Sequence, residues 1–232
     1  MQFHALVEEW PGESMAYFRE LPGCFSSAST TEGALQAAPE AIESYFRWLK
    51  ENGIALFEEV NPVSVTLTER LSNVNENAGP LFAADRAAPD DQEIDNALNV
   101  AATARAQIIE LVASVPPELH DRIPPSGGWS LTQHLRHIME NETWYISRLL
   151  EQPEEEPPTT LTDADSISMK LFENAMDYEL ILRELTPEQR SRVLTHDGEE
   201  WTAAKVLRRM VGHLREHAGW MEELVEQLSV KK

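Results

Sequence analysis

The feature that most constrains the fold is a change in the spacing of apolar residues part-way along the chain. Up to about residue 70, short apolar stretches alternate with polar side chains, a period typical of β-strands. Beyond residue 93 the apolar side chains recur every three or four positions, as they do in amphipathic helices. Residues 73–92 have no period and are rich in Asn, Gly, Pro, Ala and Asp. We therefore predict an α+β protein with a small domain at 1–72, a linker at 73–92 and a helical domain at 93–232.

The small domain is predicted to have the order β-β-β-α-β. Strands are expected at about residues 3–7 and 15–18, with a third after a turn at 21–25, followed by a helix at about 32–51 and a strand at about 63–67. Thr31 is the expected helix cap, and Asn52 with Gly53 gives a typical stop signal. Pro39 lies inside this helix, so we expect it to kink the second turn and shorten the helix.

The second domain is predicted to be a four-helix bundle. Helical spacing covers about residues 94–115, 130–150, 165–185 and 203–229. Ser130 and Gln133 have the spacing of a capping box at the start of the second helix. The acidic, proline-rich connection at 151–162 is long enough, at roughly 35 Å, to let the third helix run parallel to the second.

Charge excludes one class of partner. The chain has 40 acidic and 19 basic side chains, a net charge of −21. The acidic excess is spread evenly along the chain. Residues 1–92 have 15 acidic and 5 basic side chains, and residues 93–232 have 25 acidic and 14 basic side chains. Nucleic-acid binding depends on Lys and Arg that neutralise phosphates, so we expect no nucleic-acid partner.

Cysteine content and hydropathy limit the compartment and the kind of metal site. The single cysteine, Cys24, cannot form an internal disulfide, so any metal site must be built from His, Asp and Glu. No segment approaches the roughly 20 apolar residues that span a bilayer, and the start lacks the pattern of a signal peptide. We expect a cytoplasmic protein without membrane attachment, in which Cys24 is a small buried residue.

Four of the seven histidines lie on the second and fourth predicted helices. His217 falls on the apolar seam of the fourth helix, where burial requires partners for its nitrogens. His213 lies one turn earlier, so both imidazoles point the same way and could share a divalent ion. The second helix offers His134 and His137 as a third ligand. Helical pitch alone favours His134, which lies nearer the apolar stripe.

Residues 213–217 also match the H-x-x-E-H motif of inverted zinc peptidases, in which the glutamate is the general base. Helical geometry directs Glu216 away from the core seam and toward water. Only fifteen residues follow His217 to supply a further carboxylate ligand. We interpret this match as accidental.

The helical half resembles a known family. The residues that carry the resemblance are Trp129-Ser130-Leu131, His137, Trp201-Thr202, His213 and His217. They are similar to the DinB-like superfamily, which includes bacillithiol- and mycothiol-dependent transferases. The resemblance implies a four-helix bundle with a divalent metal held by His137, His213 and His217, and it makes His134 a core or supporting residue.

The same resemblance implies a chemistry. It points to attack of a thiolate or hydroxide on a small electrophile, with the metal as Lewis acid, by a thiol S-transferase-like or hydrolytic enzyme. Three nitrogens do not select the metal, and we expect zinc or nickel ahead of iron or manganese. The expected substrate is a small molecule or a thiol, and no catalytic acid or base is assigned.

The small domain resembles a HicB-type antitoxin-like domain. The matching residues lie at 3–8, 21–24, 30–35 and 41–42. This resemblance implies a protein partner, and a homodimer is compatible with it. The alternative function is therefore a non-catalytic HicB-like interaction or regulatory module joined to a structural bundle.

Several further residues are weaker candidates. Trp144 and Trp220 each follow a proposed ligand by seven positions and could line a pocket, but we expect core packing. Arg105 interrupts the first helical seam, and we expect it to extend to the edge of the bundle rather than to clamp an anion. The run of acidic residues at 154–156 is predicted to be a solvated loop.

Overall fold

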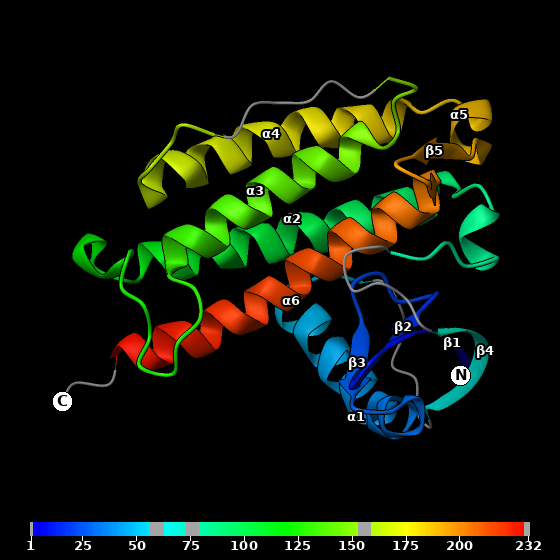
Figure 1. Cartoon of the computed structure of the whole chain (residues 1–232), viewed down its shortest axis with the longest axis horizontal. Helices are drawn as coiled ribbons and strands as arrows, with labels where there is room; N and C mark the ends of the chain where they lie inside the picture. Colours follow the sequence, from blue (N-terminus) through cyan, green and yellow to red (C-terminus); the bar gives the residue numbers. More distant parts are fainter. Residues whose placement is uncertain (1, 56–62, 73–78, 153–158, 230–232) are drawn as a thin grey trace.

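The computed structural model describes residues 2–55, 63–72, 79–152 and 159–229. Figure 1 shows a small mixed α/β part beside a layer of long helices. The β-β-β-α-β order is confirmed, and its elements are β1 (Gln2–Trp10), β2 (Glu13–Phe18), β3 (Phe25–Ala28), α1 (Thr31–Glu51) and β4 (Ser64–Ser72). The strand order is β3-β2-β1-β4, with β4 parallel to β1 and the other neighbours antiparallel.

Helix α1 differs from the prediction in two details. Its cap is Thr30, whose side chain accepts a hydrogen bond from the Gly33 backbone N–H, and not Thr31. Pro39 does not shorten the helix, which continues to Glu51. The residues on its inner face, Ala38 and Ile42 among them, are fully buried against the sheet. That packing offsets the one backbone hydrogen bond that proline removes.

The helical half has the four predicted helices. They are α2 (Asp91–Ala113), α3 (Leu131–Ser147), α4 (Ala164–Glu184) and α6 (Ala203–Ser229). The predicted capping box of Ser130 and Gln133 is present at the start of α3. In Figure 1, α3 and α4 run in the same direction, as predicted. Of the connection at 151–162, residues 153–158 lie outside the described residues, and so does the acidic run at 154–156.

Three short elements between α4 and α6 were not predicted. They are α5 (Pro187–Ser191), β5 (Leu194–His196) and β6 (Glu199–Trp201), and the two strands form an antiparallel hairpin. Among the described helices, none combines the length and hydropathy that a membrane span needs.

The two halves are packed together through buried ion pairs. Glu8 on β1 is 1% exposed and accepts hydrogen bonds from Arg208 at 2.8 Å and Arg209 at 3.1 Å, both on α6. Arg208 also binds Asp85, which lies in the segment predicted as a linker. Phe82 in that segment is fully buried. These contacts fix the first half of α6. His213 follows Arg208 and Arg209 by about one helical turn on the same helix.

Candidate metal centre

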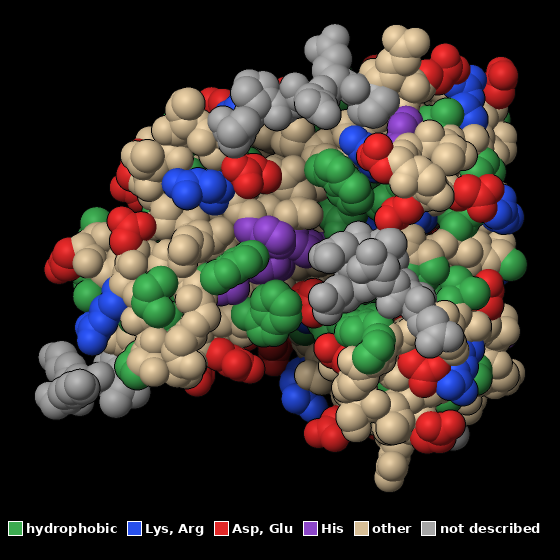
Figure 2. All heavy atoms as spheres, in the orientation of Figure 1, with side chains coloured by type: hydrophobic (Ala, Val, Ile, Leu, Met, Phe, Trp, Pro, Cys, Tyr) green, Lys and Arg blue, Asp and Glu red, His purple; other side chains and the backbone are tan. Residues whose placement is uncertain are grey.

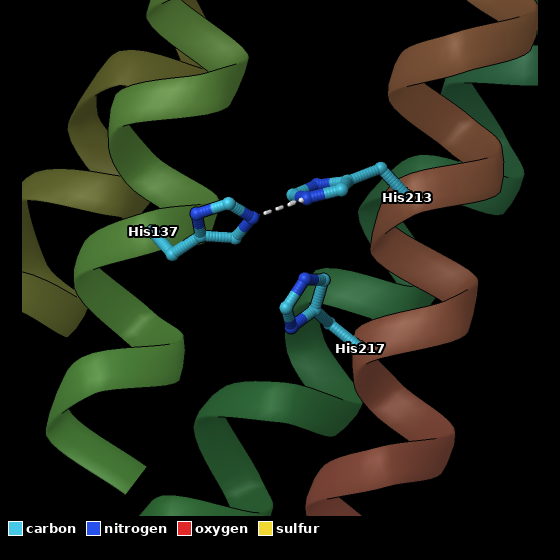
Figure 3. A group of neighbouring side chains, drawn as sticks. All are labelled: His137, His213 and His217. Carbon is cyan, nitrogen blue, oxygen red and sulfur yellow. Dashed lines mark hydrogen bonds between the residues drawn. The ribbon is translucent and has the colours of Figure 1, made fainter. Parts of the chain in front are cut away.

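Two helices bring the histidines together. The capping box fixes the start of α3, so that His134 and His137 lie in its first two turns. On α6, His213 and His217 lie one turn apart on the face directed at α3. Figure 3 shows the imidazoles of His137, His213 and His217 directed toward a common centre from the two helices.

The three imidazoles are close enough to share one ion. Nε2 of His137 lies 3.0 Å from Nε2 of His213. His137, His213 and His217 each offer a ring nitrogen, and these nitrogens lie within 4.8 Å of one another. Ring centroids of His213 and His217 are 4.4 Å apart. Three nitrogens at such spacing can each approach one divalent ion after small side-chain adjustments.

His134 takes part in the same cluster through a different contact. Its Nδ1 lies 2.9 Å from Nδ1 of His217, and its side chain is buried. Both histidines of α3 therefore contact the pair on α6. His137 contacts His213 through Nε2, and His134 contacts His217 through Nδ1.

Burial keeps the cluster neutral. It lowers the pKa of His134 to about 4 and that of His213 to about 3, with neighbouring positive charge adding to the effect. Burial also lowers the pKa of His137 and His217. Neutral imidazoles retain the lone pairs that bind metals. Nδ1 of His213 is buried and finds no hydrogen-bond partner among the described residues.

The four histidines of the cluster line an open pocket of about 560 Å³. In Figure 2, the histidines form a patch that reaches the surface and is bordered by hydrophobic side chains. The lining residues are Pro124, Ser126, Gly127, Gly128, Trp129, His134, His137, His213, Glu216, His217, Trp220, Glu223, Leu224 and Gln227. The pocket therefore joins the loop before α3 to the C-terminal half of α6.

The prediction that Glu216 points to water is wrong. Glu216 lines the pocket beside the histidines and is partly buried. Burial raises its pKa to about 7, while Arg209 opposes this effect and Glu13 adds to it. Glu13 belongs to β2. Glu216 is partly buried because the small sheet lies against this side of α6, whereas helical geometry alone predicts that this side faces solvent.

Two expectations for other side chains are also wrong. Trp144 and Trp220 are 38% and 48% exposed, so neither is a core residue. Trp220 lines the pocket, whereas Trp144 packs on Trp201. The side chain of Arg105 neither extends to the bundle edge nor points into the pocket.

Arg105 instead forms a buried ion pair with Glu142 of α3. Glu142 is fully buried, and burial raises the pKa of its carboxyl while Arg105 opposes the shift. No local sequence pattern indicates the role of Glu142, because its partner is on another helix. The expectation for Cys24 is confirmed, since it is 3% exposed and burial raises the pKa of its thiol.

The pocket-lining role of Trp129 and Glu223 was missed as well. Glu216, Trp220 and Glu223 are spaced by four and three residues, which places them on one face of α6 together with the histidine pair. This spacing is the sequence signal that could have indicated which residues of α6 line the pocket.

Fold and site together define a helical-bundle protein with a histidine cluster between two of its helices. Within that class the chain belongs to the DinB superfamily, whose sequence pattern matches residues 101–221. A search of curated proteins found no match. Among solved structures, the chain is similar to one of YfiT from Bacillus subtilis, with 21% identity and a TM-score of 0.53, over 66% of this chain and 96% of that one. YfiT is described as a probable metal-dependent hydrolase with an unusual four-helix bundle topology. The HicB-like character of the small domain stays a prediction.

Proposed function

We propose that this protein is a metal-dependent enzyme that acts on a small molecule, with one divalent ion held by His137, His213 and His217. The observation that carries the proposal is the convergence of these three imidazoles in an open pocket. The reaction class we propose is attack of water or a thiol on a small electrophile, either hydrolysis or thiol S-transfer.

The donor set fits a divalent metal. Three neutral imidazoles provide nitrogen ligands, and Nδ1 of His217 already has a partner in His134, which leaves its Nε2 available. Such an ion would act as a Lewis acid on water, a thiol or a carbonyl group. Zinc, nickel, iron and manganese all accept three nitrogen ligands, with zinc or nickel our first expectation.

The open pocket favours an enzyme over a structural metal site. Structural zinc sites are closed by four protein ligands, whereas catalytic sites leave a position for water or substrate. The described structure places three histidines together beside a pocket of about 560 Å³. The description of YfiT as a probable metal-dependent hydrolase is in keeping with this proposal. In the alternative, the small domain binds a protein partner and the bundle is only structural.

Metal content tests the ligand set. The full-length protein and His217→Ala would be purified without added chelator and examined by elemental analysis, with His4→Ala as control. His4 lies outside the cluster and pairs with Glu20. We expect close to one equivalent of metal in the wild type and in His4→Ala, and a loss in His217→Ala. Equal, near-zero content in all three, before and after incubation with zinc or nickel, would refute the site.

Activity tests the reaction class. Metal-free protein and protein reloaded with zinc or nickel would be compared on small esters and on a thiol-plus-electrophile pair. We expect turnover only in the loaded protein, and none in loaded His217→Ala. Full metal occupancy with a fourth protein ligand, and no turnover on any substrate, would favour the structural alternative.

A further inference from the structure

Two tryptophans line the pocket beside the histidine cluster. Trp129 and Trp220 are 43% and 48% exposed, although large aromatic side chains are usually mostly buried. Both contact His217, with ring centroids 6.2 Å and 4.9 Å from it. The exposed aromatic surface therefore begins directly beside the histidine cluster and extends outward from it.

Other tryptophans of this chain already hold cations. Arg215 lies 3.7 Å from the ring centroid of Trp48, Lys205 lies 3.8 Å from that of Trp201, and Arg148 lies 4.9 Å from that of Trp144. Among the described residues, no arginine or lysine lies over Trp129 or Trp220 in this way. Trp129 is stacked on His217, whereas Trp220 is 48% exposed and has ring surface available for a cation from outside the chain.

The charge of the pocket favours the same ligand. Glu216 and Glu223 lie one helical turn before and after Trp220, on the face of α6 that lines the pocket. Within the described part of the chain, no lysine or arginine lines it. A net charge of −21 also raises the local concentration of cations around the whole molecule.

We propose that the pocket binds a small organic cation, an amine or quaternary ammonium group, against the face of Trp220 and beside the carboxylate of Glu223. The rest of the ligand reaches inward past Trp129 to the histidine cluster. This inference rests on the proposed function, because it names the substrate class of the same site. An aromatic face and a carboxylate that line the same pocket recognise a cation better than any neutral group of the same shape.

The test compares a cation with its neutral isostere. Choline and 3,3-dimethylbutan-1-ol have nearly the same shape and differ in charge, and binding of each to the full chain would be measured by calorimetry at constant ionic strength. We expect choline to bind at least about tenfold more tightly. Trp220→Leu and Glu223→Gln should each weaken choline binding about fivefold or more. Glu226→Gln, an exposed change outside the pocket on the same helix, should leave it unchanged.

Metal content of the same preparations separates this inference from the proposed function. If the metal is bound but choline and the alcohol bind equally, or neither binds saturably, the cation inference is wrong and the metal centre stands. If choline binding is selective and sensitive to Trp220 and Glu223 in protein that takes up no metal, the cation pocket stands and the metal-dependent function fails. Equal weakening by Glu226→Gln and Glu223→Gln would also overturn the inference, since it would reduce the effect to net charge.

Discussion

His134 and His217 face each other through their Nδ1 atoms, 2.9 Å apart and buried between α3 and α6. In such a pair one nitrogen donates a proton and the other accepts it. When His217 is the donor, its proton is on Nδ1 and its Nε2 keeps the lone pair that a metal requires. With His217 as the donor, the contact with His134 orients His217 and fixes this tautomer, the role that outer-shell partners have in metal sites.

The first prediction concerns His134. His134→Ala should weaken binding of zinc or nickel about 10- to 100-fold without abolishing it, because the three proposed ligands remain. His217→Ala should abolish binding under the same conditions. Competition against a chromophoric chelator would measure both affinities. An unchanged affinity would show that His134 has no orienting role, and complete loss would make His134 a ligand.

The second prediction concerns the ion pair between Arg105 and Glu142, which holds α2 to α3 inside the bundle. Arg105→Met leaves the fully buried carboxyl of Glu142 without its cation, and such a loss costs about 3 kcal/mol in the free energy of unfolding. The double variant with Glu142→Gln should recover most of it. Urea unfolding would measure the three proteins.

The loss from Arg105→Met should depend on pH with a defined sign. Burial raises the folded-state pKa of Glu142 and Arg105 lowers it, so removing Arg105 raises this pKa further, and the folded variant keeps a proton that the unfolded chain has already released. Stability is then lost as pH rises through the folded pKa, and Arg105→Met should be less stable at about pH 8 than at about pH 5.5 relative to the wild type. A pH-independent difference would contradict the assignment to the Glu142 carboxyl.

The third prediction concerns Lys205, which is fully buried under Trp201 and donates to the backbone carbonyl of Glu200 at 2.8 Å. Burial lowers the pKa of its amine to about 8. A lowered pKa means that the unfolded chain binds more protons from about pH 8 to 10, so stability rises with pH across that window. Between about pH 8 and 10, the free energy of unfolding of the wild type should rise by about 2 kcal/mol more than that of Lys205→Met. Lys170→Met, at a half-exposed lysine, should show no such trend.

The helices were predictable because their signals are local. The seam of α2 and the capping box at Ser130 are patterns within a few turns of one segment. The β5–β6 hairpin was missed because each strand has three residues, too few to show a period. Its turn did carry a signal, since Asp197 and Gly198 have φ of 54° and 84° and Asp-Gly is a preferred hairpin turn.

The site was predictable only in part, since it depends on contacts between helices. The position of His217 on an apolar seam indicated a buried imidazole that needs partners. Pitch alone favoured His134 over His137, but one helix does not show where its neighbour lies, so pitch could not show that both contact α6. The structure brings both to α6, each to a different histidine. The environments of Arg105 and Glu216 depend in the same way on side chains from other elements.

The last prediction tests how tightly the small domain is joined to the bundle. Gly23, in the turn before β3, has a φ of +75°, and a Cβ there would lie 2.8 Å from Cγ of Arg215 and 2.9 Å from Cγ1 of Val211 on α6. Gly23→Ala therefore adds a steric clash at the interface to the cost of a left-handed backbone, and we expect a loss of about 2 to 3 kcal/mol in the free energy of unfolding. Gly53→Ala is the matched control, because Gly53 has a φ of +68° and open space around it. It should cost only about 1 kcal/mol. Equal losses in urea unfolding would mean that the turn at Gly23 does not press against α6.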